Sequence, residues 1–128
     1  MRTRAEAVLV VTADEMLAER IRWSLEYFGL RTNLATNSVE AARCLTGDGP
    51  IGVVVDLRFP EADQVVRRAA LCPELHDAPI VALEDHPDDS DSLLGSGCTA
   101  VLLRDTAPQA IAEEVTRLIH ARTHGTVQ

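Results

Sequence analysis

The sequence predicts a one-domain α/β protein in which helices cover both faces of a five-stranded parallel sheet. Its 128 residues fit a single domain, and short runs rich in valine and isoleucine alternate with segments whose apolar residues recur every three or four positions. The most informative run is 51–60, because its apolar residues Val53 to Val55 end on a single acidic residue, Asp56, and glycine and proline residues bound it. Such a run suits a strand that is buried on both faces of a parallel sheet.

The first half of the chain opens with a predicted strand at 7–11, after which the pattern changes to that of a helix. Gly29 is expected to end this helix, because helices commonly stop at a glycine. Trp23 and Tyr27 lie away from the centre of its inward stripe, so we expect them at the stripe's margin or on partly covered surface. The segment 30–36 then alternates apolar and polar residues, as a half-exposed edge strand does. The inward stripe consists of Leu17, Ile21, Leu25 and Phe28.

Two helices flank the run that contains Asp56. The first begins at Asn37 or Ser38, either of which can cap it, and ends at the glycine-rich breaker 46–50. The second is predicted over 61–71. The residues expected to face the sheet are Val39, Ala42 and Leu45 in the first helix and Val65, Val66, Ala69 and Ala70 in the second.

Each of the last two predicted strands ends beside a charged residue. The fourth strand is 79–83, which Glu84 follows, and the fifth is 99–103, which Arg104 follows. Between them, 85–97 is the least regular part of the chain. Its cluster of aspartates suits a loop and the amino terminus of a helix, where acidic residues complement the helix dipole.

A final helix with Pro108 in its first turn completes five strand–helix units. Its inward stripe consists of Ile111, Val115, Leu118 and Ile119. The last residues, 123–128, are expected to form a short, frayed tail. Five units in a chain of this length favour a doubly wound, flavodoxin-like (βα)5 sheet with strand order 2-1-3-4-5.

This strand order brings four strand ends together in the crevice where open α/β sheets bind ligands. Asp56 is the central residue there, because a carboxylate at the end of a rigid strand is presented to solvent. The alternative is that Asp56 caps the next helix. Carboxylates and a guanidinium suit phosphoryl groups, divalent cations or ion pairs. The predicted pocket consists of Thr12, Ala13, Asp14, Glu15, Asp56, Glu84 and Arg104.

Composition and missing motifs exclude several functions. The net charge of −8 argues against direct binding of nucleic acid. The chain contains no glycine-rich dinucleotide fingerprint, no Walker loop and no nucleophile elbow. Its apolar runs are too short to span a bilayer and it begins without a signal peptide, so we expect a cytoplasmic protein that does not bind membranes. Cys44, Cys72 and Cys98 lack zinc or disulfide spacing and are predicted to be small core residues.

The chain resembles the receiver domains of bacterial two-component response regulators from Ala7 to about Arg122. The resemblance implies a single receiver-like domain over 1–128, with its core at about 7–122, and a signalling rather than an enzymatic role. The motifs that carry it are Val8-Leu-Val-Val, Val-Val-Val-Asp56-Leu with Pro60 four residues later, Pro79-Ile-Val-Ala-Leu, Gly95-x-Gly97-Cys-Thr-Ala and the Pro108 helix.

In such receivers, two acidic residues after the first strand and an aspartate after the third hold Mg²⁺, and that aspartate accepts phosphate from a histidine kinase. Asp56 matches this phosphoacceptor. Thr12 and Ala13, however, stand where the acidic pair would be. Three further departures are Glu84 in place of a serine or threonine, Arg104 in place of a lysine, and Val101 in place of an aromatic residue.

These departures predict a weakened phosphorylation site. Asp14 and Asp56 remain as weak candidate metal ligands, so we expect no cofactor, with Mg²⁺ needed only if Asp56 is a working acceptor. The Glu84 charge would oppose a phosphoryl group, since two like charges about 4 Å apart repel by roughly 4 kcal/mol at an effective dielectric near 20. Arg104 is expected to bridge Asp56 and Glu84 with its planar fork.

The main hypothesis is therefore a pseudo-receiver that works through protein contacts. The alternatives are a competent phosphoacceptor at Asp56, a small-molecule site in the same crevice, and an inactive pocket that only helps to hold the sheet edge together. The expected partners are an output domain, a histidine kinase or another regulator. A second copy of the chain is also expected to bind, through the face formed by 85–97, 99–103 and the final helix.

Overall fold

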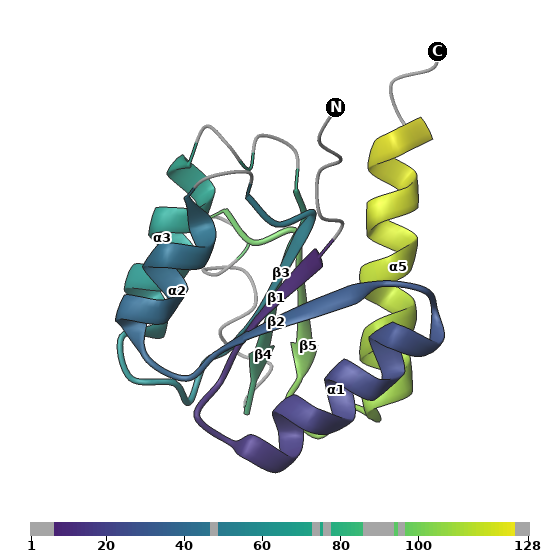
Figure 1. Ribbon diagram of the computed structural model, residues 1–128, viewed down its shortest axis with the longest axis horizontal. Helices are drawn as coiled ribbons and strands as arrows, with labels where there is room; N and C mark the ends of the chain where they lie inside the picture. The colour runs from purple at the N-terminus through teal and green to yellow at the C-terminus, as the bar shows by residue number, and fades with distance from the viewer. Residues whose placement is uncertain are drawn as a thin grey trace.

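The computed structural model describes residues 7–46, 49–72, 75, 78–85, 94 and 97–124, with side chains up to residue 121. Five parallel strands form one sheet in the order β2-β1-β3-β4-β5, as the sequence predicted (Figure 1). The strands are β1 (Ala7–Val11), β2 (Arg31–Ala35), β3 (Gly52–Asp56), β4 (Ile80–Glu84) and β5 (Ala100–Leu103).

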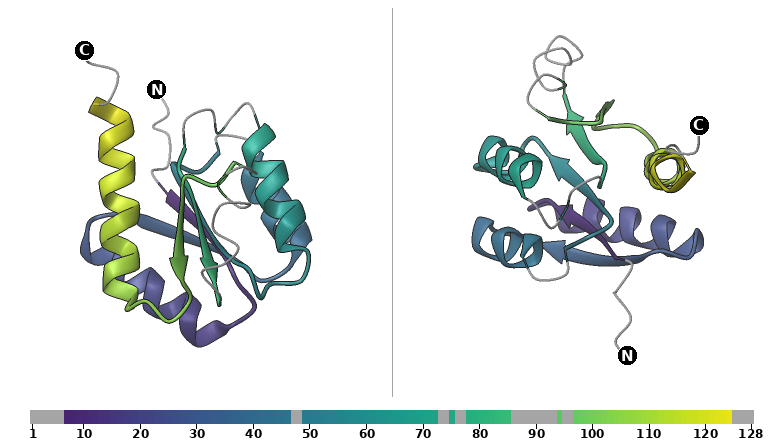
Figure 2. Two further views of the ribbon diagram at one scale, coloured as in Figure 1. Left: turned by 180° about the vertical axis from the view of Figure 1, so that it is seen from behind. Right: turned by 90° about the horizontal axis from the view of Figure 1, so that it is seen from above.

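Helices cover both faces of this sheet. Seen from above, α2 and α3 lie on one side of the sheet and α1 and α5 on the other (Figure 2). Two apolar cores result, because neighbouring residues of a strand point to opposite faces. Val53 and Val55 belong to the core beneath α2 and α3, whereas Val54 belongs to the core beneath α1 and α5. The helices are α1 (Glu15–Tyr27), α2 (Ser38–Leu45), α3 (Ala62–Leu71) and α5 (Pro108–His124).

The three inner strands are buried along their whole length, whereas β2 alternates between exposed and covered residues. Both patterns match the predictions for central and edge strands. The expected helix in 85–97 and the expected tail lie mostly outside the described residues. Within the described part, α5 continues to His124.

Some predicted core positions are wrong. In α2, Val39 is 65% exposed, and Ala41 rather than Ala42 is buried beside Leu45. In α3, Ala70 is exposed and Ala62 takes its place in the core. These helices are short, so one or two apolar residues at a margin do not fix the direction of the buried face.

The three cysteines differ in burial. Cys98 is buried, as predicted, and burial raises the pKa of its thiol to about 11. Cys44 and Cys72 are only half-buried at the margin of the core beneath α2 and α3. None of the three forms a disulfide with another described residue.

Candidate functional site

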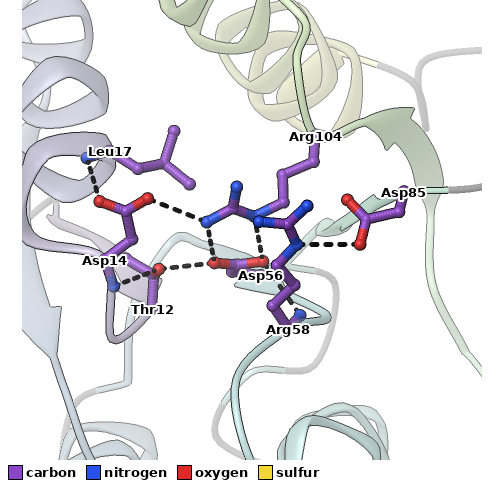
Figure 3. A network of polar contacts seen from close by, with 7 residues as sticks. All are labelled: Thr12, Asp14, Leu17, Asp56, Arg58, Asp85 and Arg104. Carbon is purple, nitrogen blue, oxygen red and sulfur yellow. Dashed lines mark hydrogen bonds and ion pairs between the residues drawn. The ribbon is translucent and has the colours of Figure 1, made fainter.

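The candidate site centres on Asp56, the last residue of β3, whose carboxylate is buried. Its oxygen Oδ2 accepts hydrogen bonds from Thr12 Oγ1 at 2.7 Å and from Arg104 Nη2 at 3.2 Å (Figure 3). Its other oxygen, Oδ1, accepts from Arg104 Nε at 2.9 Å and from the backbone N–H of Arg58 at 3.1 Å. Each oxygen therefore already has two donors, which offsets much of the cost of burying the charge.

Arg104 supplies the cation of the site from the end of β5. Its backbone N–H donates to the carbonyl of Glu84 at 2.7 Å, which continues the pairing of β4 with β5 by one residue. Its guanidinium binds Asp56 through two nitrogens and also donates from Nη2 to Asp14 Oδ2 at 3.0 Å. These partners, with the Asp56 hydrogen bonds contributing most, raise the pKa of Arg104 further above its ordinary value. The site thus holds a permanent positive charge between two carboxylates.

The turn between β1 and α1 brings the other carboxylate to Arg104. Asp14 is the N-cap of α1, and its Oδ1 accepts from the backbone N–H of Leu17 at 3.1 Å. The backbone N–H of Asp14 donates to Thr12 Oγ1 at 3.0 Å, so the threonine hydroxyl links this turn to Asp56. The Leu17 hydrogen bond, followed by the one from Arg104, lowers the pKa of Asp14.

Arg58 is a site residue that sequence reasoning missed. Its backbone N–H contacts Asp56, and its side chain pairs through Nε with Asp85 Oδ2 at 2.9 Å (Figure 3). This pair joins the loops after β3 and β4 at the same edge. The sequence feature that could have pointed to Arg58 is its position two residues after Asp56, the aspartate that ends the strand.

Not every predicted pocket residue joins this network. Glu84 is buried at the end of β4, but Arg104 uses Asp14 and Asp56 as carboxylate partners, so the predicted bridge to Glu84 is wrong. The difference follows from the N-cap, which holds the Asp14 carboxylate over the crevice. Ala13 and Glu15 are exposed beside it.

The alternative interpretation of Asp56 as a helix cap is wrong. The N-cap of α3 is Glu61, five residues further along the chain. Glu61 has a left-handed backbone conformation with φ of 68°. The carboxylate of Asp56 instead accepts from Arg58 N–H inside its own loop.

The residues present do not fit a divalent cation. Mg²⁺ requires about six oxygen ligands in near-octahedral geometry, several of them with free lone pairs facing the ion. Here both oxygens of Asp56 are engaged, and the Arg104 guanidinium joins them to Asp14. Within the described ranges, no group of three or more His, Cys, Asp or Glu side chains is arranged to hold a metal ion.

Sequence comparison relates the chain to response regulators, although no protein-family model matches it. Response regulator MprA of Mycobacterium avium is 29% identical over 126 residues, covering 84% of this chain and 55% of that protein. MprA of Mycobacterium ulcerans is 31% identical over 88 residues, covering 69% of this chain and 38% of that protein. The chain therefore spans about half the length, or less, of these curated relatives.

Comparison with solved structures identifies the fold. The receiver domain of Francisella response regulator 1452 has a TM-score of 0.79 at 22% identity and covers 92% of this chain and 98% of its own. A CheY-like receiver domain protein of Methanospirillum hungatei gives a TM-score of 0.80 at 15% identity, with 94% and 98% coverage. The chain has the CheY-like receiver fold, and most of its sequence is similar to response regulators. In the described part, no helix is both long and apolar enough to cross a membrane.

Proposed function

We propose that this chain is a receiver-type regulatory domain of two-component signalling whose acceptor site is closed by Arg104, and that it works through protein contacts. The observation that carries the proposal is the double hydrogen bond from Arg104 to Asp56, with Asp14 as the second carboxylate partner. In a receiver of the common type, the equivalent aspartate is a metal ligand and a nucleophile. Here its oxygens are held by protein donors instead.

The charge balance of the pocket supports this proposal. Asp14, Asp56 and Arg104 together carry a net charge of −1, and the buried Glu84 lies at the end of the strand next to Asp56. Phosphorylation would replace the single negative charge of Asp56 with the roughly two charges of an acyl phosphate, so the pocket would gain about one more negative charge at neutral pH. With no paired carboxylates at Thr12 and Ala13 to recruit a divalent cation, this charge would remain largely uncompensated.

If the pocket is closed to metal and phosphate, the domain acts through the contacts that its surface makes with other proteins. Partners would be another regulator, an output domain or a histidine kinase that binds without transferring a phosphoryl group. The acidic chain, with its net charge of −8, favours partners with basic contact surfaces.

The direct test is incubation with acetyl phosphate and Mg²⁺, followed by intact-mass measurement. The proposal predicts no phosphoryl adduct in the wild-type chain. A suitable control is Ala13→Asp combined with Arg104→Lys, which restores one acidic residue and replaces the bidentate fork with a single ammonium. An adduct on the wild-type chain that disappears in Asp56→Asn would instead establish a working phosphoacceptor.

A further inference from the structure

An apolar stripe without a partner runs along the outer face of α1. Met16, Trp23 and Tyr27 have exposed fractions of 66%, 68% and 81%. With 3.6 residues per turn, these three and Arg20 fall within an arc of about 60°. The helix buries its opposite face through Ala18, Ile21 and Leu25.

The composition of this stripe is typical of an interaction surface. The chain has only four aromatic residues, and two of them, Trp23 and Tyr27, lie exposed here. Tryptophan, tyrosine and arginine are also the residues that most often dominate binding energy at protein interfaces. Clustered exposure of such side chains is a recognised mark of a binding site.

A hollow in the surface lies next to the stripe. Its volume is about 400 Å³, and it is lined by Trp23, Ser24 and Tyr27 of α1 and by Gln109 of α5. The first turns of α5 pack over the carboxyl-terminal half of α1, as Figure 1 shows. An apolar side chain from a partner could be seated there.

We propose that this stripe, rather than the face formed by 85–97, 99–103 and the final helix that the resemblance suggested, is the interface through which two copies of the chain associate. The two α1 helices would lie antiparallel about a two-fold axis. Met16 and Tyr27 lie equally far from the midpoint of the stripe, and so do Arg20 and Trp23. Antiparallel pairing therefore places Arg20 of each copy over Trp23 of the other, a cation–π contact. It also places Met16 of each copy against Tyr27 and the hollow of the other, a sulfur–aromatic contact.

The charges around the stripe fit this arrangement. Arg22 is paired with Glu19 on the same helix, whereas Arg20 has no ion pair with any other described residue. The Arg20 guanidinium is therefore available to a neighbouring molecule. A self-complementary patch of this kind is what a two-fold interface requires.

The same charges predict a weak dimer that salt strengthens. Each copy carries a net charge of −8, so two copies repel at low ionic strength, and added salt screens this repulsion. A basic partner protein would show the opposite dependence, since salt would screen its attraction to this chain. The direction of the salt effect therefore distinguishes a second copy of the chain from a basic partner protein at this stripe. The inference does not depend on the state of Asp56.

Sedimentation equilibrium over a range of protein and NaCl concentrations tests the proposal. We expect a monomer–dimer equilibrium that tightens with salt, and a dissociation constant at least about tenfold weaker in Trp23→Ala, as for an interface hot spot. Leu71→Ala is the matched control, because Leu71 is 76% exposed on α3, away from this face, and should leave the equilibrium unchanged. Trp23 is the only tryptophan, so its emission should shift to longer wavelength on dilution.

Three results would overturn this assignment. The first is a chain that stays monomeric at millimolar concentration. The second is a dimer that weakens as salt is raised. The third is a dimer that Leu71→Ala weakens and Trp23→Ala does not.

Discussion

At the residue scale, Arg104 is the cation that lies between the carboxylates of Asp56 and Asp14. Its planar guanidinium offers several donors in a fixed geometry and can bind two carboxylates at once, which a lysine ammonium at the same place would do less well. Its side chain is 17% exposed and that of Asp56 only 3%, so the pair lies in a poorly solvated environment. Removing one partner there leaves a buried charge without compensation, which costs more than the loss of a surface ion pair.

The first prediction concerns this pair. Arg104→Ala should lower the free energy of unfolding by roughly 1–3 kcal/mol at neutral pH, the range for a buried polar group left without its partner. In an Asp56→Asn background the same substitution should cost much less, because the orphaned charge is gone. Urea unfolding of the two single variants and the double variant gives the coupling energy.

Glu84→Gln is the control for this cycle. Arg104 binds Asp56 and Asp14 rather than the Glu84 carboxylate. Glu84→Gln should therefore reduce the destabilisation caused by Arg104→Ala less than Asp56→Asn does. The observed pairing would be contradicted if both substitutions reduced the destabilisation equally, or if Arg104→Ala left the free energy of unfolding unchanged.

The second prediction concerns Asp14 and pH. Its folded-state pKa lies below the ordinary value of 3.8, chiefly through the Leu17 N–H and then through Arg104. The stability it contributes is therefore present above about pH 4 and is lost as the pH falls through the lowered pKa. Asp14→Asn keeps a capping oxygen but loses the charge, so it should be destabilising at pH 7 and close to neutral in strong acid.

The size of this effect is limited by solvent. The Asp14 side chain is 42% exposed, so its ion pair with Arg104 should contribute less than about 1 kcal/mol. Thermal unfolding of wild type and Asp14→Asn at several pH values measures it. A difference that grows toward acid pH would contradict the assignment.

At the element scale, the site depends on how the loops after the strands are held. Gly97, which precedes β5, lies against Ala70 of α3. Gly97 has a φ of +114°, and a Cβ at this position would lie 2.6 Å from the Cβ of Ala70. The glycine is therefore required by both its backbone conformation and its neighbour. Strand β5, which carries Arg104 at its end, follows directly.

The third prediction compares two glycines. Gly29 also has a positive φ, of +85°, but a Cβ there would meet nothing within 4 Å. Gly29→Ala should cost about 1–2 kcal/mol, the penalty of a left-handed backbone alone. Gly97→Ala should cost a further 1–3 kcal/mol or so for the steric overlap.

A compensating variant separates the two contributions. Ala70→Gly removes the clashing methyl group, so the double variant with Gly97→Ala should recover the overlap cost but not the backbone cost. Chemical denaturation of the four variants provides the measurement. Equal costs for Gly29→Ala and Gly97→Ala would show that the loop moves away from α3 without penalty.

At the scale of the whole molecule, the strand pattern and connection rules were enough to predict the fold. Runs such as Val53-Val-Val are apolar on both sides, which only an inner strand of a covered sheet allows, and the strand order followed from the five strand–helix units. The same order predicted that the ends of β1, β3, β4 and β5 meet, and it brought Arg104 to Asp56.

The finer features of the site were harder to predict. The choice of Asp14 over Glu84 depends on a capping hydrogen bond that fixes one carboxylate over the crevice, and nothing in the spacing of the sequence expresses that geometry. The exposure of Trp23 and Tyr27 was underestimated for a related reason. A helical stripe gives the direction of the buried face, but not how far neighbouring elements reach around its sides.

The central claim is that Arg104, rather than a divalent cation, neutralises the acidic pocket. Calorimetric titration of the chain with Mg²⁺ tests it most directly, with Asp56→Asn as the reference. We predict no saturable binding at micromolar Mg²⁺ and only weak, non-saturating heat at millimolar concentration, equal in the wild type and in Asp56→Asn. Micromolar binding to the wild-type chain that disappears in Asp56→Asn would contradict the account, because it would require Asp56 to exchange its Arg104 hydrogen bonds for a metal ion.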